Sequence, residues 1–344
     1  MYSIDEINGE SFLLGLCAQA EKKCSLNVQN IKELKEWKTT TKKSLLDTIG
    51  FNKLKPDRSD AELIESVKFE TYRRDKYILP TAVNLKMPLY VIVPNHCNGK
   101  VIIAIHGHGS YGKEGIAGNL PFGANSNTKN SAYALELAKE GFIAVCPDIL
   151  GSGERMTGLC EDDIRSLCDM INNPLSALGL SLQGVALFEL MQLTKFALSL
   201  KENKFDKAGS CGFSGGGLFS LLLSALCDNI DVSVVSGYFH TQKDTCLQSN
   251  KCGCNFVHNM WNTADCGELA ALAAPKPLFI ECGKEDKLHG RSGQESVYKQ
   301  FETAKKAYTF YNKEENLQLV FCEGAHRWYG SCYEFLDKVL NQAL

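Results

Sequence analysis

The chain has 344 residues, of which 44% are apolar and 22% charged, with a formal net charge of −3. That composition suffices for one large hydrophobic core, and the small net charge argues against nucleic acid or an anionic membrane as a main partner. No apolar run approaches the roughly 18 residues that span a bilayer, and the acidic N-terminal segment lacks the positive charge of a signal peptide.

Residues 1–65 are lysine-rich and polar, and apolar residues such as Ile31, Leu34 and Trp37 recur in them at helical spacing. We interpret this segment as a helical extension of two or three helices that packs on the main body, residues 66–344. The main body begins with two segments of alternating polarity, VKFETYR and MPLYVIVP. They predict antiparallel strands at the edge of a sheet.

Further along, uninterrupted apolar strands alternate with helical segments. Strands are predicted at 101–105, 142–146, 208–213, 232–237, 277–282 and 317–322, and helices at 131–141, 173–200 (one or two), 215–226, 296–311 and 333–344. This alternation is typical of an α/β fold with a mainly parallel central sheet and helices on both faces. Residues 238–268 fit no regular element, and we expect them to lie over the carboxyl edge of the sheet, where such folds place their sites.

A glycine-flanked serine joins one predicted strand to the next helix. The run Gly212-Phe213-Ser214-Gly215-Gly216 fits G-x-S-x-G, in which small neighbours allow the serine to occupy a strained turn. The helix that begins at Gly215 would direct its amide groups and its positive dipole end at the serine. A tight turn or a phosphate-binding loop is the alternative interpretation, and we favour Ser214 as a nucleophile.

The loop His106-Gly107-His108-Gly109 directly follows an earlier buried strand. A serine hydrolase needs two backbone amides to stabilise the oxyanion, one after the nucleophile and one from such a loop. We therefore predict an oxyanion hole made by the amides of Gly215 and His108, with Gly109 as the alternative to His108. We expect His106 to be a buried histidine bonded to backbone, in preference to a metal ligand together with His108.

An acid and a base follow the last two predicted strands. Asp286 comes after PLFIEC and His326 after LQLVFC, so both are expected at the carboxyl edge of the sheet. His326 would take the proton of Ser214 and pass it to the leaving group, while Asp286 would orient the imidazole and stabilise its charged form. Glu285 is the alternative acid and His289 the alternative base.

Together these residues resemble the α/β-hydrolase superfamily, and more narrowly its acetyl xylan esterase-like and dienelactone hydrolase-like branch. The matching pieces are HGHGSYGKEG, PDILGSGER, CGFSGGG, APKPLFIECGKED and GAHRW, within residues 88–344. The resemblance implies an α/β-hydrolase fold and ester hydrolysis, with acetylated carbohydrate as one substrate class. Dienelactone hydrolases use a cysteine nucleophile where this chain has Ser214, which argues against dienelactone chemistry itself.

The loop PDILGSGER, residues 147–155, follows the strand after the predicted oxyanion loop. Its charged residues lie near the expected site. We interpret Asp148, Glu154 and Arg155 as ion-paired residues that order the loop. Direct contact of Glu154 or Arg155 with substrate is the alternative.

Fifteen cysteines are scattered along the chain, several within apolar strands. Their odd number and their positions favour reduced thiols in a cytoplasmic protein over a disulfide framework. Four of them, with a nearby histidine, were weighed as a zinc site: Cys246, Cys252, Cys254, Cys266 and His258. Their irregular spacing does not match the usual C-x₂₋₄-C pairs, so we predict neither a metal site nor a cofactor.

We interpret 238–268 instead as a loop over the active site that supplies the apolar wall of the substrate pocket. Its candidate wall residues are Tyr238, Phe239, His240, Phe256, Met260 and Trp261. Of these, Tyr238 and Trp261, together with Gly109, are the predicted substrate-binding residues.

The sequence thus predicts a serine hydrolase that cleaves a small-molecule or carbohydrate ester through an acyl-enzyme. No nucleic acid or membrane partner is expected, and a homo-oligomer is left open. A serine peptidase or amidase would use the same residues but usually carries a further domain. A non-catalytic binding protein of this fold would not need nucleophile, acid, base and oxyanion loop together.

Overall fold

The computed structural model describes residues 4–109, 111–120, 132–156, 164–248 and 251–341. Its centre is a sheet of nine strands in the order β1-β2-β3-β5-β4-β6-β7-β8-β9. The strands are β1 (Glu62–Lys68), β2 (Tyr72–Ala82), β3 (Leu85–Pro94), β4 (Val101–Ile105), β5 (Ile143–Pro147), β6 (Ala208–Phe213), β7 (Ile230–Ser236), β8 (Leu278–Gly283) and β9 (Leu317–Cys322). The strands from β5 to β9 in this order are parallel, as predicted.

The antiparallel edge contains three strands where the sequence predicted two. β1, β2 and β3 pair in succession, and β3 pairs antiparallel with β5. The segment VKFETYR, taken as one strand, is the turn between β1 and β2, where the amide of Phe69 donates to the carbonyl of Tyr72 at 2.8 Å. The alternation of apolar and polar residues continues through this tight turn, so the periodicity of the sequence does not show where β1 ends and β2 begins.

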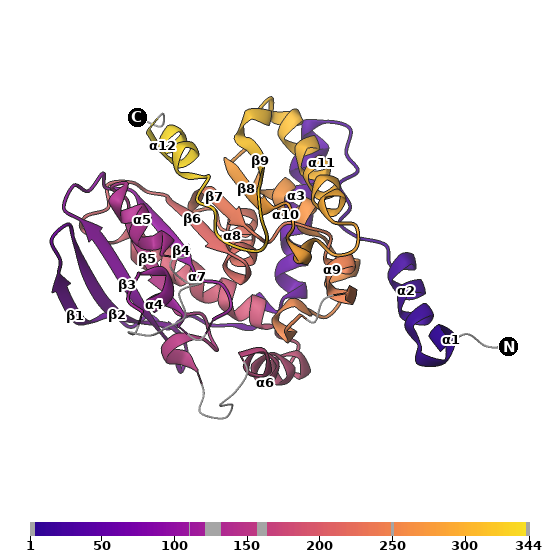
Figure 1. Cartoon of the computed structure of the whole chain (residues 1–344), viewed down its shortest axis with the longest axis horizontal. Coiled ribbons are helices and arrows are strands. Elements are labelled where there is room, and N and C mark those ends of the chain that lie inside the picture. The colour runs from indigo at the N-terminus through magenta and orange to yellow at the C-terminus, as the bar shows by residue number, and fades with distance from the viewer. Residues whose placement is uncertain (1–3, 110, 121–131, 157–163, 249–250, 342–344) are drawn as a thin grey trace.

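Helices cover both faces of the sheet (Figure 1). Alternate residues of β4 show why, since Ile103 and Ile105 face one apolar cluster and Ile102 and Ala104 face the other. The first cluster packs against α3 (Ile31–Thr48), α7 (Leu182–Leu198), α8 (Gly215–Leu226), α10 (Cys266–Ala273) and α11 (Gln294–Tyr311). The second packs against α4 (Lys113–Ile116), α5 (Tyr133–Lys139) and α12 (Tyr333–Asn341). A strand buried on both faces must be apolar at every position, which is what the continuous runs predicted.

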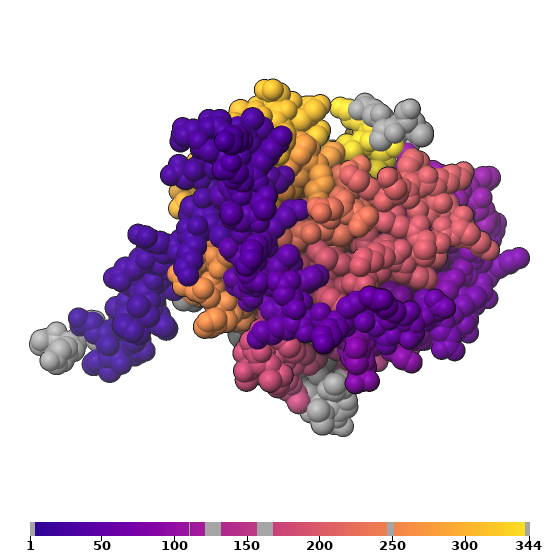
Figure 2. All heavy atoms as spheres, turned by 180° about the vertical axis from the view of Figure 1, so that it is seen from behind, coloured from indigo at the N-terminus to yellow at the C-terminus, as the bar shows by residue number. Residues whose placement is uncertain are grey.

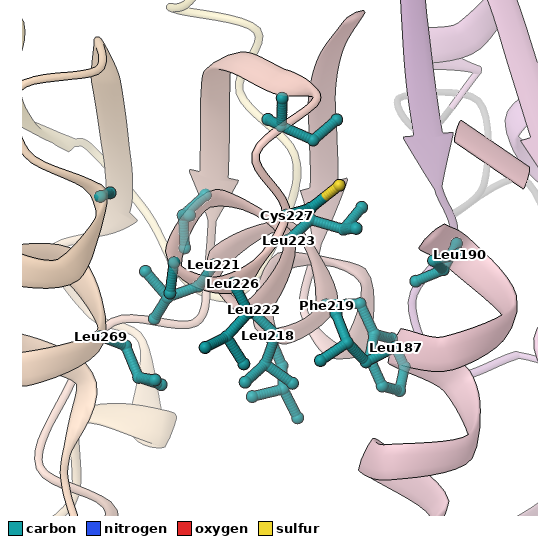
Figure 3. Close-up of a cluster of buried hydrophobic side chains, with 14 of the residues drawn as sticks. Leu187, Leu190, Leu218, Phe219, Leu221, Leu222, Leu223, Leu226, Cys227 and Leu269 are labelled. Atoms are coloured by element: carbon teal, nitrogen blue, oxygen red, sulfur yellow. The ribbon is translucent and has the colours of Figure 1, made fainter. Parts of the chain in front are cut away.

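Helix α8 is the apolar centre of the first face. Its leucines point both toward the sheet and toward Leu187 and Leu190 of α7 and Leu269 of α10 (Figure 3). Every residue of α8 is buried. Because α8 begins at Gly215, the packing of this helix fixes the position of the predicted nucleophile that precedes it.

The N-terminal segment divides into two parts. Helix α3 packs on the body through Leu34, Leu45 and the following Ile49, all fully buried. Helices α1 (Ile4–Asn8) and α2 (Glu10–Gln19) contain no buried residue and project from the body (Figure 2). Of residues 1–65, α3 packs on the main body through buried side chains, and α2 contacts it through the carbonyl of Cys17, which accepts a hydrogen bond from Lys243 at 2.9 Å.

The segment 238–268 contains more regular structure than its sequence indicated. It includes α9 (Gln242–Gln248) and two 3-10 turns, Gly253–Asn255 and Met260–Asn262. The stretch 173–200 holds the end of α6 (Ile164–Ala177) and the whole of α7. Within the described ranges no single helix is long and apolar enough to cross a membrane. Two consecutive helical segments, Cys168–Ala177 and Leu182–Leu198, are long and apolar enough only when taken together, and they are bent by 98° relative to each other.

We expect Leu222→Ala in α8 to lower the free energy of unfolding by about 2–5 kcal/mol, because it leaves a cavity in a fully buried helix. Urea denaturation followed by circular dichroism measures the change. Leu178→Ala is the matched control, since Leu178 is 67% exposed and should cost less than about 0.5 kcal/mol. Equal losses for the two variants would contradict the assignment of α8 to the core.

Candidate active site

Ser214 occupies a strained turn between β6 and α8. Its backbone has φ 57° and ψ −120°, a conformation that costs energy for any residue with a side chain. A Cβ at Gly212 would collide with the backbone of Gly216, and one at Gly216 would collide with the carbonyl of Ile105. Both glycines of the motif are therefore required by close backbone contacts, and the turn presents the serine hydroxyl above the sheet.

The three residues of the predicted triad meet at the carboxyl edge of the sheet. Nε2 of His326 lies 2.9 Å from Oγ of Ser214, and Nδ1 of His326 lies 2.7 Å from Oδ2 of Asp286. Both distances are those of hydrogen bonds. The arrangement can carry a proton from the hydroxyl to the imidazole while the carboxylate orients the ring.

Asp286 is held from two sides. Its side chain is buried, Oδ2 faces His326, and Oδ1 accepts a hydrogen bond from the amide of Leu288 at 2.9 Å. Burial opposes the charged carboxylate, but the hydrogen bond and charge of His326 outweigh it and hold the pKa of Asp286 below its usual value. The ionised form of Asp286 is therefore favoured, and this is the form that stabilises the positive charge of a protonated His326.

The two alternative residues lie elsewhere. Glu285 is exposed, and its backbone amide donates to Gly324. His289 is buried, its two ring nitrogens have no hydrogen-bond partner among the described residues, and burial lowers its pKa. The structure therefore brings Asp286 and His326, and neither of these two, into the hydrogen-bonded row with Ser214.

The imidazole of His326 is fixed by packing as well as by hydrogen bonds. It follows β9, and its ring lies 4.5 Å from the ring of Phe213, centroid to centroid. A Cβ at Gly237 would approach Cε1 of His326 to 3.1 Å, so the end of β7 passes close beneath the ring. These contacts restrict rotation of the imidazole between the serine and the aspartate.

The predicted oxyanion amides are adjacent. A Cβ at Gly215 would lie 3.7 Å from the backbone nitrogen of His108, so the two loops are in contact. Gly215 opens α8, where the amides have no partner within the helix. The His108 amide makes no hydrogen bond within the part of the chain that is described.

His106 is bonded to the backbone, as the sequence predicted. Its Nδ1 lies 2.7 Å from the carbonyl of Gly107, and its Nε2 accepts from the amide of Ile149 at 3.0 Å. Both ring nitrogens are thus engaged, and burial lowers the pKa of His106. The side chain braces the oxyanion loop against the loop after β5 and is not placed to ligate a metal ion.

A pocket of about 190 Å³ opens over Ser214. It is lined by His108, Ser214, Gly215, Tyr238, Lys251, Cys252, Asn255, Leu288 and His326. Tyr238, predicted to bind substrate, is in this wall, and its hydroxyl donates to Asn255 at 2.8 Å. Gly109 and Trp261 are not among the lining residues, and the Trp261 ring packs beside Phe256 at 6.4 Å.

The pocket is also lined by Lys251, Asn255 and Leu288, which the sequence did not predict there. Two of them, Lys251 and Asn255, lie within the segment 238–268, whose predicted wall residues are apolar or aromatic. The third follows Asp286 by two positions, close enough to be inferred from the acid. No feature of the sequence distinguishes Lys251 and Asn255 from the other polar residues of their segment.

The PDILGSGER loop is tied down by buried ion pairs. Nζ of Lys113 lies 2.7 Å from Oδ2 of Asp148, both side chains being fully buried, and Lys113 also contacts Glu154. Burial disfavours the charged amine, but Asp148 and Glu154 outweigh it and raise the pKa of Lys113. Arg155 makes two bonds of 2.9 Å to Glu189 of α7. These contacts order the loop, as we inferred, and leave Arg155 no role at the pocket.

Of the five residues in the cysteine cluster of the sequence, Cys246 has a side chain outside the described part of the chain, and Cys266 and His258 do not join Cys252 and Cys254. Cys266 lies in the main core and His258 is exposed. Cys252 and Cys254 instead meet His108 of the oxyanion loop and Cys168 of α6. Hydrogen bonds from Cys168 and Cys254 hold the pKa of Cys252 well below that of a free thiol.

The sheet order, the strained serine turn and the hydrogen-bonded row of serine, histidine and aspartate define an α/β-hydrolase. The chain belongs to the Abhydrolase family, whose model matches residues 16–322. The resemblance drawn from the sequence motifs, and the fold that it implied, are thereby confirmed.

Named relatives agree with this family. The provisionally named hydrolase YtaP of Bacillus subtilis (strain 168) is 24% identical over 255 residues, which cover 71% of this chain and 81% of that protein. A provisionally named acetyl xylan esterase of Bacteroides fragilis NCTC 9343 has a similar structure, with a TM-score of 0.76 and 20% sequence identity. The match covers 91% of this chain and 82% of the esterase. Methylesterase BT1017 matches this structure with a TM-score of 0.68 and 20% sequence identity. The match covers 98% of this chain and 69% of the methylesterase.

We expect Lys113→Met to lower the free energy of unfolding by about 3–5 kcal/mol, because it leaves the Asp148 carboxylate buried without its cation. Chemical denaturation measures the loss. Lys139→Met removes a cation of the exposed pair with Glu136 and should change stability by less than about 0.5 kcal/mol. If both substitutions changed the free energy of unfolding by similarly small amounts, the ion pairs of Lys113 would not stabilise the loop.

Proposed function

We propose that this protein is a serine hydrolase that cleaves carboxylic esters through an acyl-enzyme. The observation that carries the proposal is the row of two hydrogen bonds, 2.9 Å from Ser214 to His326 and 2.7 Å from His326 to Asp286. Its position supports the same conclusion, because the row borders a pocket that Gly215 and His108, the two proposed oxyanion residues, also line.

The chemistry follows from these positions. Nε2 of His326 removes the proton of the Ser214 hydroxyl as its oxygen attacks the ester carbonyl. The amides of Gly215 and His108 stabilise the resulting oxyanion, and the protonated imidazole gives its proton to the departing alcohol. Water then attacks the acyl-serine with the same imidazole as base, which releases the acid and restores the hydroxyl. Asp286 stays ionised and stabilises the imidazolium in both halves.

For the substrate we propose a short acyl group, with acetylated carbohydrate as the favoured class. The pocket of about 190 Å³ is smaller than the roughly 300–1,000 Å³ that hold drug-sized ligands. The named neighbours include an acetyl xylan esterase and a methylesterase. In an acetyl ester the small part is the acid, and in a methyl ester it is the alcohol. A pocket this small beside the serine fits the small acid.

We expect Ser214→Ala to lower kcat for p-nitrophenyl acetate by on the order of 10⁴- to 10⁶-fold, because the triad acts as a unit. Steady-state release of p-nitrophenol measures it, and a fluorophosphonate should label the wild type and not the variant. Ser292→Ala, an exposed serine elsewhere, should retain full activity. A wild type without turnover, or a variant with unchanged turnover, contradicts the proposal. Hydrolysis of a matched anilide at the rate of the ester would indicate an amidase.

We expect kcat/KM to fall by roughly tenfold or more from p-nitrophenyl acetate to the octanoate, since extra methylenes find no room in the pocket. Leu288→Ala should raise the octanoate rate selectively, because Leu288 lines that wall. Leu178→Ala is the control and should leave the chain-length profile unchanged. A preference for octanoate in the wild type would rule out a short-acyl pocket. Release of acetate from acetylated sugars tests the favoured alcohol.

A further inference from the structure

Four side chains that can ligate a metal ion converge at the oxyanion loop, one of them being His108 of that loop. Nε2 of His108 lies 3.0 Å from Sγ of Cys252 and 3.1 Å from Sγ of Cys254, and the two sulfurs lie 2.9 Å apart. Cys168 of α6 completes the group, whose four ligand atoms all lie within 4.8 Å of one another. The residues come from three separate parts of the chain, so local sequence does not explain their meeting.

We propose that His108, Cys168, Cys252 and Cys254 bind one Zn²⁺ ion in a closed structural site. Three thiolates and one imidazole are a ligand set typical of tetrahedral structural zinc. Bond lengths of roughly 2.3 Å to sulfur and 2.0 Å to nitrogen place tetrahedral ligands about 3.5–3.8 Å apart. The three shortest separations here, 2.9–3.1 Å, are below that spacing and all four atoms lie within 4.8 Å, so ion binding requires the ligands to move apart by less than about 1 Å. Because protein atoms fill all four positions, the ion holds structure and does not touch substrate.

Polar groups around the cysteines suit bound thiolates. Nδ2 of Asn255 lies 3.4 Å from Sγ of Cys252 and 3.5 Å from Sγ of Cys254, so it can donate to both sulfurs. The hydroxyl of Tyr238 holds the other end of this amide at 2.8 Å. Donors of this kind offset thiolate charge and orient metal ligands.

The turn that carries two of the ligands is anchored without them. The amide of Gly253 donates to Asp169 at 2.5 Å, and its carbonyl accepts from Asn172 at 2.9 Å, both on α6. Gln183 of α7 donates to the carbonyl of Cys254 at 2.9 Å. These bonds involve backbone atoms of the turn and no sulfur. The ligands are thus positioned before an ion binds, which lowers the ordering cost of binding.

A disulfide is the rival explanation for clustered thiols. The 2.9 Å between Sγ of Cys252 and Sγ of Cys254 is far from a bond length of about 2.05 Å. Cys168, Cys252 and Cys254 are free cysteines in the structure. A histidine nitrogen within 3.1 Å of two of the sulfurs has no role in a disulfide, whereas it completes a metal site.

The site has a consequence for catalysis that rests on the proposed function. The His108 ring lies against Gly215, where an added Cβ would come within 2.8 Å of its Nδ1. Its backbone amide is the second proposed oxyanion donor. An ion bound to Nε2 therefore fixes the residue that carries this amide, so His108 would act there as a positioning residue through the metal.

Metal content tests the proposal directly. The full-length protein is purified under reducing conditions, incubated with Zn²⁺, freed of loosely bound ion by gel filtration with a weak chelator, and analysed by inductively coupled plasma mass spectrometry. We expect about one zinc per chain. Cys168→Ser, Cys252→Ser and Cys254→Ser should each lose most of it, and Cys97→Ser, a half-buried thiol outside the cluster, should keep it. Zinc near zero in the wild type, or equal in all variants, overturns the proposal.

Cobalt provides a measurement that does not depend on the folding of any variant. Co²⁺ bound by the metal-free wild type should give the intense visible bands of tetrahedral coordination and a thiolate charge-transfer band, and Zn²⁺ should displace it. Removal of zinc should lower Tm by roughly 5 °C or more. Octahedral cobalt spectra, or a disulfide between any two of Cys168, Cys252 and Cys254 found after thiol trapping, would overturn the site.

Activity separates this proposal from the catalytic one. If the ion positions the oxyanion amide, its removal lowers kcat by roughly 10- to 100-fold and leaves KM nearly unchanged. Stoichiometric zinc in a protein that hydrolyses no ester would refute the proposed function and leave the metal site standing. Full ester hydrolysis in a protein that binds no zinc would refute the metal site and leave the proposed function standing.

Discussion

The close contact of three backbone segments at Ser214 governs the architecture of the site. β4, β6 and the start of α8 approach so closely that Gly212 and Gly216 have no room for a Cβ. This contact holds the serine at φ 57°, a strained conformation that only surrounding structure can maintain. The burial of every residue of α8 supplies that support. The position of the nucleophile therefore depends directly on the packing of the hydrophobic core.

The same contact aligns the partners of the serine. Parallel strands end at one edge of the sheet, so the loops after β8 and β9 bring Asp286 and His326 to the turn after β6. Hydrogen bonds to the backbone hold His106 and thereby the oxyanion loop, and buried ion pairs around Lys113 hold the loop after β5. The oxyanion loop and the loop after β5 are therefore each fixed by buried polar contacts, which preorganises the oxyanion site.

The cluster of His108 with three cysteines extends this rigidity toward α6. It joins the oxyanion loop to α6 and to the turn at Cys252, and that turn also lines the pocket. Asn255 links the cluster to Tyr238 in that wall. If the cluster binds zinc, as we propose, the ion, the oxyanion amide and the pocket form one connected network of contacts.

The sequence by itself determined the class of fold, the serine turn and the order of nucleophile, acid and base. These features are local: a buried parallel strand needs an unbroken apolar run, and a strained turn needs adjacent glycines. Only the tertiary structure decided which cysteines meet, since Cys168 and His108 lie far apart along the chain and no spacing rule joins them. It also separated α3 from the projecting α1 and α2, and placed Lys251 and Leu288, not Trp261, in the pocket wall. Contacts between distant segments depend on how helices and loops pack, and packing is not encoded in any short pattern.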